Sequence, residues 1–400
     1  MARALAARGE TPVLATAAEY RELVESAGIA FAPVRPGFAP FGDYQALLRK
    51  IFDVRHGVRF IVRDIVMPHL RVAYEDLGRA AEGAALLVSH PLTVTLPLIA
   101  EQRRLPWASV ILSPASLMSS YDPPVIAGAE WLHALQRLGR VPYQLVFSVL
   151  RLITRRWEAP LRAFRQEIGL PPQQGLAMLE GQFSPRLNLA LFDAPLVTPQ
   201  PDWPENLTIC GAALHDGTLS PNEREGLESF LAAGEPPLVF ALGSSAVWVA
   251  GDFWQHAIEA TRALGRRAIL VTGRDTPTRI RELPPGIAVF GYLPYSMVFP
   301  RALAVIHQAG IGTLSQALRS ARPQLIVPFA FDQPDNAHRA AALGLARVLP
   351  LKKLNGAMMA RELHSLLADA QYAGRAADVS RRLEGVNGAE RAAEALASML

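Results

Sequence analysis

Short apolar runs alternate with helical patterns along most of the chain, an order typical of parallel sheets covered by helices. In the second half, six buried strands are predicted at residues 238–242, 268–271, 288–290, 304–306, 325–327 and 347–349. Apolar residues at helical spacing lie between them, for instance over residues 253–264. This half therefore predicts a Rossmann-like, doubly wound domain.

The first half follows the same order with less regular spacing. Strands are predicted at residues 12–16, 29–34, 84–89, 106–112, 188–192 and 207–210, and a long helical region at 141–168. A run rich in turn residues begins at His215 and separates the two halves. We expect an α/β protein with domains at residues 1–214 and 236–400, joined by a linker at 215–235, whose parallel sheets face a cleft.

The order of elements at the start of the chain is unusual. Residues 2–8 have a helical pattern that stops at Gly9, and the strand at 12–16 follows. A doubly wound half begins with a strand and a loop before its first covering helix. We therefore expect that one strand and one loop are missing ahead of Met1. The alternative is a natural start with a rearranged sheet.

The residues best suited to chemistry lie between positions 303 and 349. A predicted strand ends at His307, and the small-residue turn Ala309-Gly310-Ile311-Gly312-Thr313 leads into a helix. Glycines let backbone N–H groups approach a ligand, and a helix N-terminus favours a phosphate. The next strand ends just before Asp332 and Gln333, whose side chains suit sugar hydroxyls. Because parallel strands end at one edge of a sheet, this stretch predicts a nucleotide-sugar site.

The same stretch resembles the donor-binding signature of family 1 glycosyltransferases, inverting enzymes of the GT-B fold. The signature residues are His307-Gln308-Ala309-Gly310-Ile311-Gly312-Thr313, then Pro328, then Asp332-Gln333-Pro334-Asp335-Asn336-Ala337. Ala309 replaces a glycine of the usual pattern. The resemblance spans nearly the whole chain and is closest to the bacterial sterol-, macrolide- and lipid-directed branch. Within that branch Ser113-Pro114, Asp202-Trp203-Pro204 and Asp216-Gly217 are similar to the rhamnolipid type.

The resemblance implies roles for individual residues. Donor-binding residues would be Ser244, Tyr295, His307, Gly310, Gly312, Thr313, Asp332, Gln333 and Asn336. Strand ends at His90 and Ser113 would border the acceptor, and the last helix would cross back to the first domain. The family's catalytic base lies in the segment expected to be missing, so the base is unassigned, with His90 as a weak candidate.

The implied reaction is inverting transfer of a hexose from a UDP- or TDP-linked sugar to a hydroxyl of a lipid or other small hydrophobic acceptor. Growing negative charge on the diphosphate would be stabilised by the helix N-terminus and His307, so neither a metal nor another cofactor is expected. A catalytically inactive nucleotide-sugar-binding protein is the alternative. An NAD-linked dehydrogenase is disfavoured, because Gly243-Ser244-Ser245 after the first strand of the second half is no dinucleotide fingerprint.

Composition further limits the ligands and covalent links that the chain could have. The chain has 400 residues, a net charge of +4 and one cysteine, so an internal disulfide is excluded. No cluster of cysteine and histidine and no Asp-x-Asp triplet indicates a metal, and no feature indicates nucleic acid. The start lacks a signal-peptide pattern, which favours the cytoplasm. The arginine-rich helix at 141–168 is interpreted as a solvated face; the alternative is peripheral contact with the inner membrane.

Overall fold

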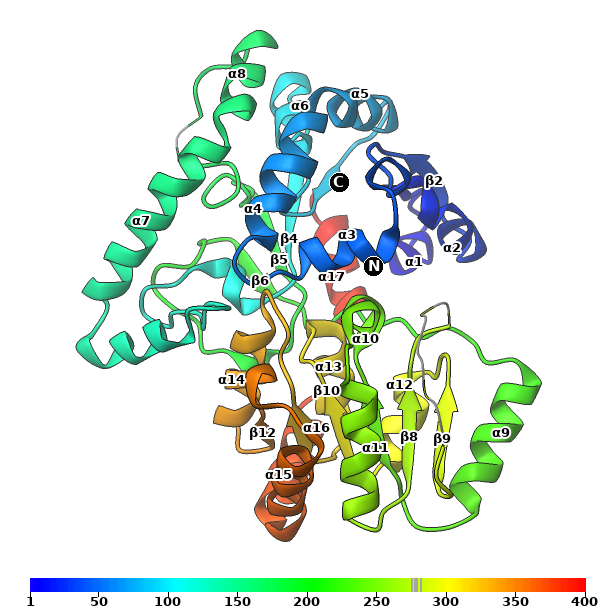
Figure 1. The fold of residues 1–400 in the computed structure, drawn as a ribbon. Coiled ribbons are helices and arrows are strands. Elements are labelled where there is room, and N and C mark those ends of the chain that lie inside the picture. The colour runs from blue at the N-terminus through cyan, green and yellow to red at the C-terminus, as the bar shows by residue number, and fades with distance from the viewer. Residues whose placement is uncertain (174, 275, 277–279, 281–282) are drawn as a thin grey trace.

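The computed structural model describes every residue of the chain except 174, 275, 277–279, 281 and 282. It contains two α/β domains stacked one on the other, with the chain termini close together at the first domain (Figure 1). All paired strands run parallel. This arrangement confirms the predicted pair of parallel-sheet domains.

The second domain is built on one six-stranded sheet of order β12-β11-β10-β7-β8-β9. The strands are β7 Leu238–Ala241, β8 Ala268–Val271, β9 Ile287–Phe290, β10 Ala304–His307, β11 Gln324–Ile326 and β12 Ala346–Val348. They are almost entirely apolar because helices cover both faces. The alternation of side chains sends Phe240 and Leu270 to one face and Val239 and Ile269 to the other.

Helices of the second domain follow the predicted spacing. Two of them, α11 Phe253–Ala263 and α15 Gly356–Ala368, pack together over one face. The remainder are α10 Gly243–Ala246, α12 Tyr295–Val298, α13 Ile311–Arg319, α14 Gln333–Ala342 and α16 Ala370–Arg382.

The segment predicted as the linker contains a helix that the sequence analysis did not identify. Helix α9 spans Pro221–Ala232 and begins with a capping box formed by Ser220 and Glu223. Its Leu227 is fully buried in the core of the second domain. Irregular backbone is left at residues 210–220, before α9, and at 233–237, between α9 and β7.

The first domain has two separate parallel sheets. Strands β1 Val13–Thr16 and β2 Ala30–Pro33 form one, and β3 Leu87–Ser89, β4 Trp107–Ile111, β5 Leu187–Ala190 and β6 Leu207–Ile209 form the other. Strands β1 and β3 do not pair with each other; apolar side chains, including Ala15 and Leu87, connect the two sheets instead.

Helices cover the four-stranded sheet on both faces. One face carries α5 Leu70–Ala80, α6 Leu96–Arg103 and α8 Ala159–Glu167, and α7 Val141–Trp157 extends along the outer edge (Figure 1). The short helix α1 Ala2–Ala6 and the final helix α17 Gly388–Ala397 pack together against the other face. The chain thus returns from the second domain to finish on the first.

The remaining helices of the first domain are short. They include α2 Arg21–Ser26, α3 Tyr44–Ile51 and α4 Gly57–Phe60. Helix α3 reaches the second domain, where the ring of Tyr44 meets Trp248 at 5.0 Å and Gln45 donates to the Trp248 carbonyl. Among the described residues, no helix is both long and apolar enough to cross a membrane.

Candidate functional site

The turn between β10 and α13 is held by His307. The imidazole is fully buried, its Nδ1 accepts from the Ala309 N–H at 3.1 Å, and its Nε2 lies 3.0 Å from Gln324 Oε1. Since Nδ1 accepts, Nε2 carries the proton and donates to Gln324. Burial lowers the pKa of His307 to about 4, so the ring is neutral at pH 7. Both ring nitrogens are engaged within the fold, and the diphosphate contact predicted for His307 stays a prediction.

Ala309 adopts a left-handed conformation that favours glycine. Its φ is +64°, and its methyl group is fully buried beside Leu314 and Leu318 of α13. Such a conformation costs an ordinary residue roughly 1–2 kcal/mol. The substitution of the usual glycine therefore leaves the turn intact, because packing of the methyl group and two backbone hydrogen bonds hold it in place.

Helix α13 begins with free backbone N–H groups. Gly310 is its N-cap and has no side chain to satisfy them, and the next two residues are Ile311 and Gly312. Gly312 is exposed, and a Cβ placed there would meet no heavy atom within 4 Å. Thr313 in the same turn is buried, with its hydroxyl 3.5 Å from Gln308 Nε2. An anion can therefore approach this helix end without displacing a side chain.

The turn after β7 lies beside this helix end. The φ of +67° at Gly243 favours glycine, and a Cβ there would come within 2.5 Å of Gln308 Nε2 and displace that side chain. The following Ser244 is exposed. Gln308 fills the space between the two turns, with its Oε1 buried and unpartnered among the described residues. The sequence analysis did not single out Gln308, because nothing in its type or spacing marks it.

Tyr295 supports the same turn from behind. Its ring stacks on Phe299 with centroids 4.3 Å apart, and its hydroxyl is hydrogen-bonded to the backbone of Gly243. Burial raises the pKa of this phenol well above its usual range. Tyr295 thus positions the β7 turn, and the nucleobase contact predicted for it stays a prediction.

Asp332, Gln333 and Asn336 follow β11, the strand next to β10. Burial raises the pKa of the Asp332 carboxyl, which accepts from Asn336 Nδ2 at 2.8 Å. Gln333 turns its Oε1 back to the N–H groups of Phe329 and Ala330, so that oxygen caps the strand end. The Asp332 carboxylate is therefore the better placed of the two predicted sugar-binding side chains.

Strain at the preceding residue fixes this loop. Phe331 has a φ of +57°, which is unfavourable for an aromatic residue. Its ring meets Phe52, just beyond α3, edge-on at 5.2 Å. A first-domain side chain thus helps to hold the backbone that presents Asp332, and strained backbone of this kind is typical of ligand sites.

Side chains from the first domain reach this edge directly. The Ser113 hydroxyl, just beyond β4, donates to Asn336 Oδ1 at 3.3 Å and is also hydrogen-bonded to Asp332. Asn336 Nδ2 in turn donates to the Ala309 carbonyl at 2.9 Å. The predicted acceptor residue Ser113 and the predicted donor residues Asp332 and Asn336 therefore lie together.

Two ion-pair clusters join the domains on either side of this contact. Arg319 of α13 makes a bidentate pair with Asp193, which is fully buried. Arg339 of α14 pairs with Asp335 on its own helix and with Asp122 of the first domain. These ion pairs were not predicted from the sequence, because the partners are far apart along the chain. Arg319 lies 126 positions from Asp193, and Arg339 lies 217 positions from Asp122.

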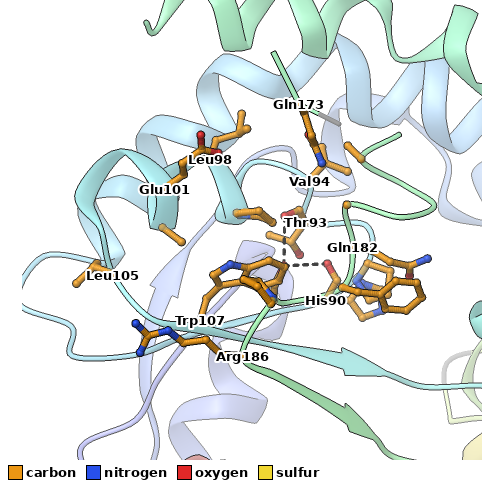
Figure 2. A pocket seen from close by; sticks show the side chains of 18 of the residues that line it. His90, Thr93, Val94, Leu98, Glu101, Leu105, Trp107, Gln173, Gln182 and Arg186 are labelled. Carbon is orange, nitrogen blue, oxygen red and sulfur yellow. Dashed lines mark hydrogen bonds between the residues drawn. The ribbon is translucent and has the colours of Figure 1, made fainter. Parts of the chain in front are cut away.

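His90 occupies a different place from Ser113. It lies at the end of β3 in the wall of a cavity of about 510 Å³, which is not lined by Ser113. The loop after β3, helix α6, Gln173 and residues 177–186 converge on this cavity (Figure 2). His90 Nδ1 accepts from the Leu92 N–H at 3.2 Å, and its Nε2 makes no hydrogen bond within the described part of the chain. Loss of solvent around the ring lowers the pKa of His90.

Comparisons with known proteins agree with this geometry. Residues 255–388 match the model for the C-terminal domain of erythromycin biosynthesis protein CIII-like proteins. The chain is 32% identical to O-mycaminosyltylonolide 6-deoxyallosyltransferase of Streptomyces fradiae, over 98% of its own length and 90% of that protein. It is 28% identical to vancomycin aglycone glucosyltransferase of Amycolatopsis orientalis, over 84% and 82% of the two chains.

Solved structures share the fold over the full length. Spinosyn forosaminyltransferase SpnP superposes with a TM-score of 0.68 at 16% identity, covering 100% of this chain and 93% of that one. Glycosyltransferase VinC, solved in complex with DTDP, gives a TM-score of 0.67 at 17% identity, covering 100% and 94%. At such identities the likeness shows the fold alone.

Proposed function

This chain belongs to the family 1 glycosyltransferases of the bacterial macrolide type, and on that basis we propose that it moves a hexose from a TDP- or UDP-linked sugar to a hydroxyl of a small hydrophobic acceptor, with inversion. One observation carries the proposal. The uncapped N-terminus of α13 and the Asp332 carboxyl lie at the ends of adjacent strands, and Asn336 ties them to Ser113 of the opposite domain.

The donor would lie along this edge. Its diphosphate would take the open N–H groups at Ile311 and Gly312, with the exposed Ser244 hydroxyl on the other side of the turn. Its sugar would lie near Asp332, whose oxygens accept hydrogen bonds from hydroxyls. Thymidine is the base we favour, because VinC and the spinosyn rhamnosyltransferase SpnG were solved with thymidine diphosphate.

The acceptor would enter from the first domain. The cavity beside His90 is lined by apolar side chains such as Val94 and Leu98, by the amides of Gln173 and Gln182, and by charged side chains. The charged ones are Glu101, Arg104, Arg165 and Arg186. Its volume of about 510 Å³ suits a small molecule or one portion of a larger one. The relatives named after tylonolide and vancomycin aglycone substrates support an acceptor of natural-product type, with a lipid hydroxyl as the other acceptor of this class.

The chemistry follows from these positions. The acceptor hydroxyl attacks the anomeric carbon as the bond to the diphosphate oxygen breaks, and a base takes the hydroxyl proton. Negative charge grows on the departing diphosphate, where the helix N-terminus stabilises it without a metal. His90 is the candidate base, since its Nδ1 is engaged by the Leu92 N–H and its Nε2 makes no hydrogen bond among the described residues.

Calorimetry and turnover test the proposal separately. TDP and UDP are titrated into the protein with a chelator present, and binding of at least one is expected. TDP-hexoses are then incubated with a panel of hydrophobic alcohols, and His90→Gln is compared with wild type for turnover. No heat from either nucleotide would refute the donor site. Full turnover by His90→Gln would remove His90 as the base without affecting the donor site.

A further inference from the structure

A stripe of exposed apolar side chains runs along α7 and the 3-10 helix before it, Glu130–Leu138. The exposed fractions are 70% for Trp131, 72% for Leu138, 64% for Leu145, 57% for Val149 and 59% for Leu152. Helix α7 extends along the outer edge of the first domain (Figure 1). The exposed side chains of the stripe point to solvent, although His133 of the same 3-10 helix meets His338 of the second domain with ring centroids 4.3 Å apart.

The spacing of apolar residues along α7 gives the helix two apolar faces. Val141, Leu145, Val149 and Leu152 are separated by four, four and three positions, which places them on one face. The opposite face is the one that holds the helix to the domain, through Tyr143 and Phe147, which are buried. The apolar residues on the inner face of α7 are accounted for, because they pack into the core of the first domain. The apolar residues on its outer face contact no part of that core.

The charge around the stripe is mostly positive, with Glu130 at the start of the 3-10 helix as the acidic exception. Residues 131–157 contain five arginines, at 137, 140, 151, 155 and 156, and no aspartate or glutamate. Arg151 pairs with Glu180. In the part of the chain that the structure describes, Arg137, Arg155 and Arg156 form no ion pair. An apolar stripe bordered by unpaired arginines has the character of a helix that lies in a membrane surface.

We propose that α7 and residues 131–140 dock on an anionic lipid surface, with the apolar stripe among the acyl chains and the arginines at the phosphate groups. A second copy of the chain fits this face less well, because pairing two such faces would bring together ten arginines of which only the two copies of Arg151 have an acidic partner. The 17-residue helix would lie parallel to the membrane plane. A chain docked in this way would hold its acceptor domain close to apolar compounds that partition into the lipid.

Vesicle flotation of the full chain tests the docking. Wild-type protein is expected to float with vesicles of phosphatidylcholine and phosphatidylglycerol at about 7:3 and to bind pure phosphatidylcholine weakly. Leu145→Ser, Val149→Ser and Leu152→Ser together should lower the partition coefficient more than tenfold, whereas Leu23→Ser, an exposed leucine on α2, should leave it unchanged. The replaced side chains are exposed, so circular dichroism should show an unaltered fold.

A charge series separates electrostatic attraction from insertion. Arg155→Gln with Arg156→Gln should weaken binding to the anionic vesicles about 25-fold, about fivefold for each arginine. Arg361→Gln with Arg382→Gln removes the same charge from the second domain and should have little effect. The proposal is overturned if wild type does not float, or if the serine variant floats equally well. It is also overturned if light scattering shows a dimer that the serine variant abolishes. Each readout is of binding, so it stands apart from the proposed transfer activity.

Discussion

Replacing His307 should remove a large part of the pH dependence of the second domain's stability. The imidazole is fully buried and neutral in the fold, with a pKa of about 4, against about 6.5 in an unfolded chain. Between about pH 4 and pH 6.5, His307 therefore binds a proton in the unfolded state but not in the folded state. The stabilisation is complete above pH 6.5 and is lost as the pH falls through 6.5 towards 4.

The magnitude follows from the two pKa values. A difference of about 2.5 units corresponds to roughly 3 kcal/mol in total, of which about 2 kcal/mol is lost by pH 5. A His307→Gln variant has no such titration. It should be less stable than wild type at pH 7.5, because the hydrogen bonds to Gln324 and Ala309 are altered, but the gap should narrow by about 2 kcal/mol at pH 5.

The assay must report on the second domain within the intact chain. Protein is equilibrated in urea at pH 7.5, 6.5, 5.5 and 5.0, then labelled with a short deuterium pulse at one common pH. Mass spectrometry of a peptide spanning 303–309 gives the unfolded fraction of β10 and its turn. Comparing wild type with the variant cancels the other titrating groups. Parallel stability curves for the two proteins would refute the assignment of a buried, neutral His307.

Three further substitutions test the site. In urea denaturation the free energy of unfolding of Ala309→Gly should stay within about 1 kcal/mol of wild type, because relief of backbone strain at φ +64° offsets the loss of a buried methyl group. Ala309→Val should lower that free energy by more than about 2 kcal/mol. Asp332→Ala should weaken the sugar nucleotide by about 1–3 kcal/mol in calorimetry and spare the free nucleotide; equal losses would place Asp332 away from the sugar. Arg319→Leu should lower the free energy of unfolding by about 3–5 kcal/mol, because Asp193 would remain buried and unpaired; an unchanged value would show that the pair contributes nothing.

The second domain was largely predictable because its signals are local. Its strands are short apolar runs buried on both faces, and the predicted boundaries at residues 268–271 match β8. The turn at His307 and the loop at Asp332 were placed on adjacent strands because parallel strands end at one edge. Helix α9 was missed because Pro221 and the polar residues around it resemble a linker, although the capping box at Ser220 was a readable signal.

The contacts between domains could not be predicted from the sequence. Ser113 and Asn336 are separated by 223 positions, and no periodicity links them. The hydrogen bonds of His307 within the fold could not be predicted either. A histidine before a glycine turn has the same sequence pattern whether its ring nitrogens bind a ligand or Gln324. The pairing of β1 with β2 apart from the other sheet also depends on which backbone groups find partners, which local propensity does not determine.

Asn336 shows why these long-range contacts matter for the proposed reaction. Its amide can donate two hydrogen bonds and accept others, and here it donates to the Ala309 carbonyl and to Asp332 while accepting from Ser113. One buried side chain thus connects the phosphate turn, the sugar-side carboxyl and the strand end of the opposite domain. Of these bonds only the one from Ser113 crosses between the domains, so a shift of the first domain against the second would break the link from its strand end to the Asn336 amide. The geometry of the donor edge therefore depends on closure of the domains, which is also the condition for an acceptor hydroxyl to meet the sugar.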